Sequence, residues 1–205
     1  MGGPQAYRED AQLFAEAVAG LGDIRLRPEV SVQEAPAPTR IAPYALALSA
    51  EVHLIPASWT GPPPAGHDAA DPVATGRFIV LHDPSGPEAW EGTWRIVSYA
   101  RATMEAELAS EPLLGEVGWS WLTETMDAAG VPRHAIAGTV TRVVSQSFAA
   151  LADRPDSIEL EVRASWTPRG DDLVDQLHAW TEVLCTIGGL PPLPSDVAVL
   201  PRPRR

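Results

Sequence analysis

The sequence predicts an α+β fold, in which a mainly antiparallel sheet of about six strands carries three helices on one face. Runs with apolar residues at every second position alternate with runs at helical spacing, in the order α-ββββ-α-ββ-α. Consecutive strands without a helix between them favour antiparallel pairing, because a parallel pair needs a crossover. Charged residues at alternate positions of the first and last strands indicate that one face of the sheet meets water.

The N-terminal part is expected to form one helix and one strand. Apolar residues recur at helical spacing in residues 5–21, and glycines close the run. Residues 26–32 alternate between apolar and polar side chains, which predicts a strand. Pro28 has no amide hydrogen, so this strand should lie at an edge of the sheet or contain a break.

Three further strands are predicted before the second helix. Apolar residues share one face of residues 44–54, residues 77–83 are apolar on both faces like a central strand, and residues 93–102 alternate again. The DPSG segment after His82 suits a tight turn, so the last two of these strands should pair. Residues 56–76 are rich in proline and glycine and have no periodicity, so we expect a flexible loop that is either an insertion or a lid.

The second helix is predicted over residues 113–129 and contains two tryptophans separated by one residue. At about 100° per residue, Leu114, Val117 and Trp121 fall on one stripe, whereas Trp119 points to another side. We therefore expect Trp121 in the core. We expect Trp119 to cover a second surface, a partner or a loop.

The C-terminal part adds a pair of strands, a third helix and a tail. Residues 136–148 and 157–166 alternate between apolar and polar side chains, and residues 173–187 carry an apolar stripe behind an aspartate cap. Residues 191–205 are proline-rich, end in arginines and are expected to form a tail. At this length, residues 1–190 are predicted to form a single domain.

The charged residues exclude several classes of function. All 15 basic residues are arginine, and lysine is absent, which excludes a lysine Schiff base and a P-loop lysine. A formal net charge of −12 disfavours direct nucleic-acid binding. The chain shows no apolar run of membrane-spanning length, no signal-like start and a single cysteine, Cys185, so we expect a cytoplasmic protein without membrane contact.

The sequence contains no motif for catalysis, metal binding or cofactor binding. The GWSWL segment around Ser120 resembles a nucleophile elbow, Gly-x-Ser-x-Gly, but Leu122 stands where the second glycine is needed. No histidine or cysteine spacing matches a metal site, and no glycine-rich loop matches a phosphate site. We therefore predict no catalytic residue, no metal and no cofactor, and a non-enzyme is favoured.

The connection between the two central strands gathers most of the candidate binding residues. Tryptophan and arginine are enriched in interface hot spots. Trp59 in the predicted loop and Trp119 on the second helix are further candidates for a partner surface. The predicted ligand-binding or partner-binding residues are His82, Asp83, Trp90, Glu91, Arg95, Trp119 and Trp59.

Two hypotheses for the function follow. In the first, the protein is a non-enzymatic binding or adaptor protein that uses a tryptophan-bearing surface for a protein partner or for self-association. The order of elements is also similar to that of small chaperone-like folds that bind client segments. In the second, it is a small-molecule-binding protein or an enzyme, with a pocket near residues 82–95 under the 56–76 loop.

Six segments of the chain carry a resemblance to a family. They are RPEV, HDPSGPEAWEG, EPLLGEVGWSWL, GTVTR, LEVRASWTP and LCTIGGLPP. Together they resemble an actinobacterial family known as a domain of unknown function, number three thousand, over about residues 14–192. The alanine-rich and proline-rich composition, with arginine as the only basic residue, suits a high-GC genome. The resemblance implies membership and brings no activity, cofactor or catalytic residue with it.

Overall fold

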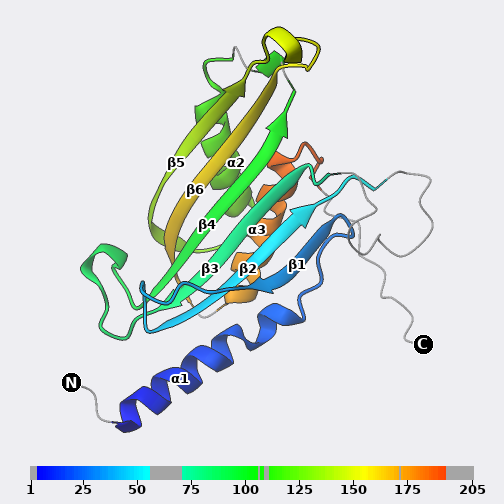
Figure 1. Cartoon of the computed structure of the whole chain (residues 1–205). Coiled ribbons are helices and arrows are strands. Elements are labelled where there is room, and N and C mark those ends of the chain that lie inside the picture. The colour runs from blue at the N-terminus through cyan, green and yellow to red at the C-terminus, as the bar shows by residue number, and fades with distance from the viewer. Residues whose placement is uncertain (1–3, 56–70, 106, 109–110, 171, 193–205) are drawn as a thin grey trace, which may run out of the picture.

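The computed structural model describes residues 4–55, 71–105, 107–108, 111–170 and 172–192. A six-stranded sheet has the order β1-β2-β3-β4-β6-β5, and every neighbouring pair is antiparallel (Figure 1). The predicted α+β class is therefore confirmed. The strands are β1 (Val30–Ala35), β2 (Tyr44–Val52), β3 (Ala74–His82), β4 (Trp94–Met104), β5 (Arg133–Ser145) and β6 (Ser157–Pro168), and the α-helices of the described residues are α1 (Pro4–Val18), α2 (Leu114–Ala128) and α3 (Leu173–Ile187).

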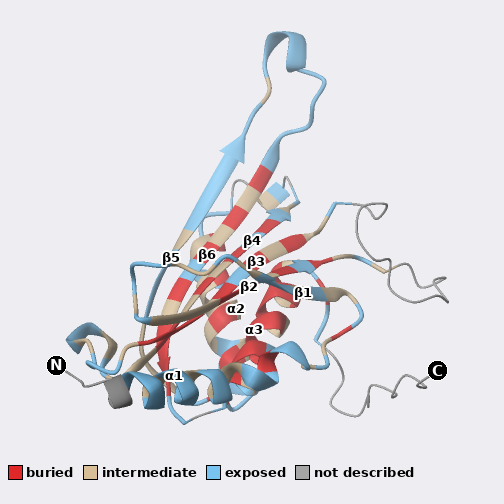
Figure 2. Cartoon of the chain, turned by 60° about the horizontal axis from the view of Figure 1, so that its bottom comes forward, coloured by how far each residue is buried: buried red, intermediate tan, exposed pale blue. Residues whose placement is uncertain are grey.

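One face of the sheet is covered by α2 and α3, which lie side by side behind the strands in Figure 1. The centre of α3 can approach β3 closely because residue 76 is glycine; a Cβ there would lie 2.7 Å from Trp180. Phe78 of β3 contacts Trp180 and Trp166, with ring centroids 5.3 and 6.4 Å apart. These side chains lie at the centre of the core, and Figure 2 shows the buried residues gathered between the sheet and the two helices.

The first helix packs against the end of the same face. Phe14 of α1 stacks on Tyr44 of β2 and Trp94 of β4, with ring centroids 5.9 and 5.7 Å apart. Tyr44 and Trp94 both stand opposite His82 of β3, so the three side chains share the helix-covered face. All three helices thus lie on one face, as the sequence predicts.

The first strand begins later than its alternation predicts, at Val30 instead of residue 26. Pro28 and Glu29 form a turn in front of it, closed by a 3.0 Å bond from the N–H of Val30 to the carbonyl oxygen of Arg27, so the break that Pro28 allowed is present. The side chain of Arg27 reaches toward α3. Its Nη1 donates to the carbonyl oxygen of Pro191 at 3.0 Å and lies 3.4 Å from a carboxylate oxygen of Glu182. The predicted edge position is confirmed, because β1 ends the sheet.

The buried stripe of α2 also differs from the predicted one. It consists of Leu114, Gly118, Leu122 and Met126, whereas Val117 is exposed. Gly118 allows the close approach, since a Cβ there would lie 3.0 Å from Leu160 of β6. A stripe built on these positions runs between the two indoles, so Trp119 and Trp121 flank it and both are half-buried.

Two predicted segments fall mainly outside the described residues. Of the predicted 56–76 loop, residues 56–70 lie outside them, and β3 already begins at Ala74. Of the predicted tail, only residues 191–192 are described. None of the helices in the described part of the chain has the length and apolar character needed to cross a membrane.

Candidate binding site

The predicted site residue His82 belongs to the core. Its ring is stacked between Tyr44 and Trp94, with centroids 5.8 and 4.3 Å away, and the residue is 2 % exposed. Its Nδ1 donates to the carbonyl oxygen of Thr93 at 3.1 Å. These contacts give His82 a structural role at the end of the helix-covered face.

Asp83 holds the turn that joins β3 to the following connection. One of its carboxylate oxygens accepts from the backbone N–H of Ser85 at 2.9 Å and from the Ser85 hydroxyl at 2.7 Å. The N–H of Gly86 donates to the carbonyl oxygen of Asp83 at 3.1 Å, which closes the turn. The carboxylate of Asp83 is therefore hydrogen-bonded within its own turn, as expected for aspartate at the first position of such a turn.

Arg95 lies on the opposite face of the sheet from His82 and ties the connection to β5 and β6. Its Nη1 donates to the carbonyl oxygen of Ala135 at 2.8 Å and to the Thr167 hydroxyl at 3.2 Å, and its Nη2 donates to the Ser165 hydroxyl at 2.6 Å. Burial lowers the pKa of this guanidinium, although the nearby charge of Glu91 acts in the other direction. Arginine keeps its proton in proteins, so a buried positive charge remains here with neutral acceptors around it.

Trp90 and Glu91 are held near Arg95 by their backbone. The Thr167 hydroxyl donates to the carbonyl oxygen of Trp90. His134 Nε2 donates to the carbonyl oxygen of Glu91 at 3.1 Å, and Glu91 itself has a left-handed φ of 53°. The structure therefore brings Trp90, Glu91 and Arg95 together on one side of the sheet and separates them from His82.

The remaining two predicted residues are tryptophans. Trp59 lies outside the described residues. Trp119 packs over Gly138 of β5, where a Cβ would lie 2.5 Å from Cζ3 of the indole. Every tryptophan in the described residues is buried or half-buried.

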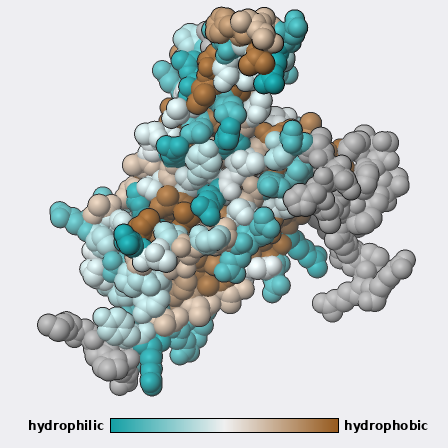
Figure 3. Space-filling view, viewed as in Figure 1, coloured by the Kyte–Doolittle hydropathy of each residue, from teal (hydrophilic) through white to brown (hydrophobic). Residues whose placement is uncertain are grey.

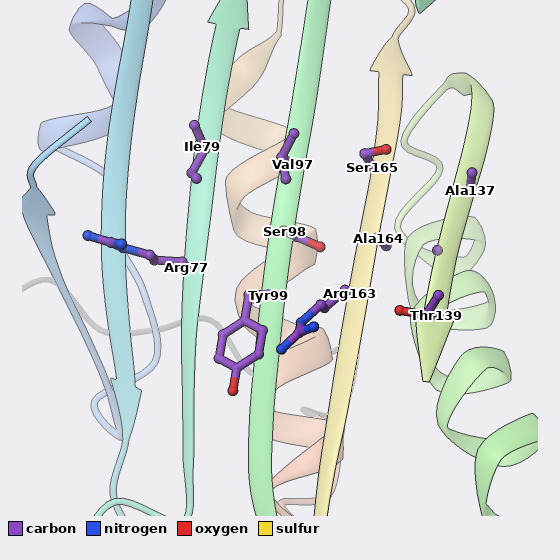
Figure 4. A pocket seen from close by; sticks show the side chains of 11 residues that line it. Arg77, Ile79, Val97, Ser98, Tyr99, Ala137, Thr139, Arg163, Ala164 and Ser165 are labelled. Carbon is purple, nitrogen blue, oxygen red and sulfur yellow. The ribbon is translucent and has the colours of Figure 1, made fainter. Parts of the chain in front are cut away.

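A hollow of about 750 Å³ occupies the face of the sheet that the helices leave uncovered, which we call the open face. Two rows of side chains run across it (Figure 4). One row contains Ile79, Val97, Ser165 and Ala137, and the next contains Arg77, Tyr99, Arg163 and Thr139; their order follows the strand pairing of β3, β4, β6 and β5.

Arginine supplies the charge in the lining of the hollow, which contains no acidic residue. The guanidinium of Arg163 lies 5.5 Å from the centroid of the Tyr99 ring, and Figure 4 shows it turned toward that ring. Glu161, one row away, accepts from Arg163 at 2.9 Å and from the Tyr99 hydroxyl at 3.0 Å. Burial and this bond to Glu161 raise the pKa of Tyr99, so the phenol stays protonated at neutral pH.

The hollow could not be located from the sequence. Its lining comes from four strands whose order in space, β3-β4-β6-β5, differs from their order in the chain. The available signal was the second face of each strand, where Arg77, Ile79, Val97, Tyr99, Arg163 and Ser165 alternate with core residues.

A second exposed feature is the hairpin that joins β5 to β6, residues 141–157, which we call the arm. It extends beyond the helices in Figure 2, and apolar surface appears at its tip in Figure 3. Its large exposed hydrophobic residues are Val143, Val144, Phe148 and Leu151, with exposed fractions of 39, 47, 74 and 48 %. β5 is also an edge strand, so its outer backbone groups face no neighbouring strand in the described part of the sheet.

The chain was compared with protein families, with curated proteins and with solved structures. A family model described as "Protein of unknown function (DUF3000)" matches residues 10–198, which leaves out only the first nine and the last seven residues. No curated protein and no solved structure matches. The family resemblance stated from the sequence is thereby confirmed, and the chain belongs to the DUF3000 family.

Proposed function

We propose that this protein is a non-enzymatic binding protein that takes up a protein partner by strand addition along the free edge of β5. The observation that carries the proposal is the combination, on one element, of an unpaired strand edge and exposed apolar side chains. An edge strand presents a row of backbone donors and acceptors that another strand can pair with. The exposed residues of the arm lie next to that edge.

After the register irregularity between His134 and Ala137, β5 lacks the usual protection of an edge. Between Ala137 and Ser145 it contains no proline, no lysine and one arginine, Arg142, and five of these nine residues are β-branched. Natural edge strands are commonly blocked by proline, lysine, bulges or short length. β1, the other edge, has six residues against thirteen in β5, and prolines stand near both of its ends. The two edges therefore differ in their capacity to accept a strand.

The charge of the arm also permits association. Arg142 and Arg154 are balanced by Asp153 and Asp156, so the formal charge of the arm is zero in a protein of net charge −12. An acidic partner, such as a second copy of this chain, can therefore approach the arm without the repulsion expected from the net charge of the whole protein. We place the protein-binding surface on the arm, where the exposed apolar side chains lie, instead of on the tryptophans.

A matched pair of variants tests this proposal. Thr141 and Ser31 are exposed, lie on the two edge strands and belong to the same row across the open face. Thr141→Lys should abolish association, because a lysine on the edge opposes pairing, and Ser31→Lys should leave it intact. Phe148→Asp should act like Thr141→Lys by placing a charge in the apolar tip.

The measurement has two parts. Light scattering of the purified chain over a range of concentrations detects a second copy, and affinity purification from the cells that make the protein detects a different partner. Hydrogen exchange on the associated form should then show protection of β5 amides. A monomeric wild type without a bound protein, or equal association of all variants, would contradict the proposal.

We also infer that the protein works in the cytoplasm of an actinobacterium. The lone cysteine is buried in α3, which suits a reducing compartment, and the exclusive use of arginine suits a high-GC genome. Fractionation of the source cells followed by immunoblotting checks the location.

A further inference from the structure

We propose that the hollow on the open face binds an organic carboxylate with an apolar body, at a site separate from the β5 edge. The volume of about 750 Å³ lies within the range of roughly 300–1,000 Å³ that is usual for ligand sites. The carboxylate would sit on β6 and β5, and the apolar body would extend over β4 and β3.

The floor of the hollow is apolar and partly accessible. Ile79 and Val97 stand opposite each other on β3 and β4, and both are half-buried, although they belong to the face without helices. The ring of Tyr99 lies in the next row. Covering these partly exposed apolar side chains with an apolar ligand removes them from water, which makes the free energy of binding more favourable.

Ser165 supplies a directed hydrogen-bond donor beside this floor. Its oxygen accepts from Nη2 of Arg95 at 2.6 Å, so its own proton is free to donate to a ligand. Arg95 is buried, and its charge has no carboxylate in hydrogen-bond contact among the described residues. An anion bound to the Ser165 hydroxyl would therefore lie in the field of this buried cation, which Glu91 influences by its charge without a hydrogen bond.

Arg163 provides the direct contact for the anion. It lies two residues from Ser165 on the same face of β6, and its partner across the strands is Thr139 of β5, which adds a second hydroxyl to the site. Its side chain is 61 % exposed, and its bond to Glu161 uses Nη2. The other donors of the guanidinium remain available for a carboxylate.

The charged side chains that line the hollow are arginines, whereas the acidic residues of the open face lie outside the lining. Glu159 is paired with Arg101, Glu161 with Arg163, and Glu51 with His53 at 3.3 Å. Arg77 and Arg95 have no such acidic contact among the described residues. The lining of the hollow itself contains Arg77 and Arg163 and no carboxylate, which favours an anionic ligand over a neutral or cationic one.

A competition experiment tests the proposal. The fluorescent anion 8-anilinonaphthalene-1-sulfonate is bound to the full chain and displaced with decanoate or with decanol, which has the same chain length and no charge. All binding measurements are made in the Phe148→Asp variant, which lacks the apolar tip of the arm. A negative result then concerns ligand binding at the hollow and does not bear on the proposed strand addition at β5. Circular dichroism confirms that each variant is folded.

The expected result is displacement by decanoate with a dissociation constant at least about tenfold lower than that of decanol. Arg163→Gln should weaken decanoate binding about tenfold or more, and Val97→Thr should weaken both competitors. Arg101→Gln is the control, since Arg101 lies on the same face but outside the lining.

Absence of probe binding, equal competition by decanol, or equal loss of decanoate binding in the Arg163 and Arg101 variants would overturn the proposal. Stronger displacement by an acidic peptide than by decanoate would assign the hollow to a protein segment and overturn it as well.

Discussion

At the scale of single residues, Gly138 determines how the second helix meets the sheet. The indole of Trp119 occupies the space that a side chain at position 138 would fill. Helical periodicity describes only the helix itself, so the sequence assigned Trp119 to a separate surface. The gap that receives the indole is created by a glycine on a different element, and a helix pattern cannot reveal it.

Replacing this glycine should destabilise the fold. In Gly138→Ala, the new Cβ would lie 2.5 Å from Cζ3 of Trp119 and nearer still to the carbonyl oxygen of Arg163, so either the indole or β6 must shift. Overpacking of this kind typically costs about 1–3 kcal/mol. Gly115→Ala is the control, because a Cβ there meets nothing within 4 Å and alanine is the better helix former. Urea denaturation should give shifts of opposite sign, and equal effects would show that Trp119 does not depend on the gap.

Burial changes the pKa of the single cysteine and thereby makes the stability of the fold depend on pH. Cys185 of α3 is 1 % exposed, and burial raises the pKa of its thiol from 9.0 to about 12. The unfolded thiol therefore ionises at a lower pH than the folded one. The stabilising contribution is fully present below about pH 9 and is lost as the pH rises toward about 12.

This shift predicts a pH dependence of stability that Cys185→Ala should lack. The free energy of unfolding of the wild type, relative to that of the variant, should stay constant up to about pH 9 and fall above it. Urea denaturation of both proteins at a series of pH values measures the difference. Other groups that titrate in this range act on both proteins, so a difference that stays constant up to about pH 11 would refute the predicted shift.

At the scale of elements, the three helices are attached to the sheet to very different extents. Ten residues of α3 are buried, and Asp172 caps the helix by accepting from the N–H of Asp175 at 3.0 Å. In contrast, α1 has no buried residue among those described, and its main ring contacts pass through Phe14. The strong periodicity of α3 and β6 made both predictable, whereas alternation alone did not reveal that β1 begins only after the turn at Pro28 and Glu29.

Removing the aromatic contact should release α1 while the rest stays folded. In Phe14→Ala, the stacking on Tyr44 and Trp94 is lost, so amides of α1 should exchange rapidly and those of α3 should remain protected. Tyr7→Ala removes an aromatic from the same helix that is 62 % exposed, and it should leave the exchange pattern unchanged. Hydrogen exchange with mass spectrometry separates the two cases, and equal protection of α1 in all three proteins would refute the role of Phe14.

At the scale of the whole molecule, the sheet divides the protein into a structural side and an exposed side. The sequence predicted this division, because charged residues alternate with apolar ones in the first and last strands. It could not predict which residues from different strands become neighbours on the exposed side. His82 and Arg95 illustrate this limit, since they are close in the chain and lie on opposite faces. Arg77 and Thr139 are far apart in the chain and share one row.

The bond between Arg27 and Pro191 links the beginning of the described chain to its end. The segment after α3 is thereby fastened to the loop in front of β1, and it provides a backbone acceptor for a guanidinium that is only 6 % exposed. A recombinant fragment that stops at the end of α3 would therefore leave this buried guanidinium with the carboxylates of Glu29 and Glu182 but without its backbone acceptor. The shortest version of this protein worth expressing must extend past that proline.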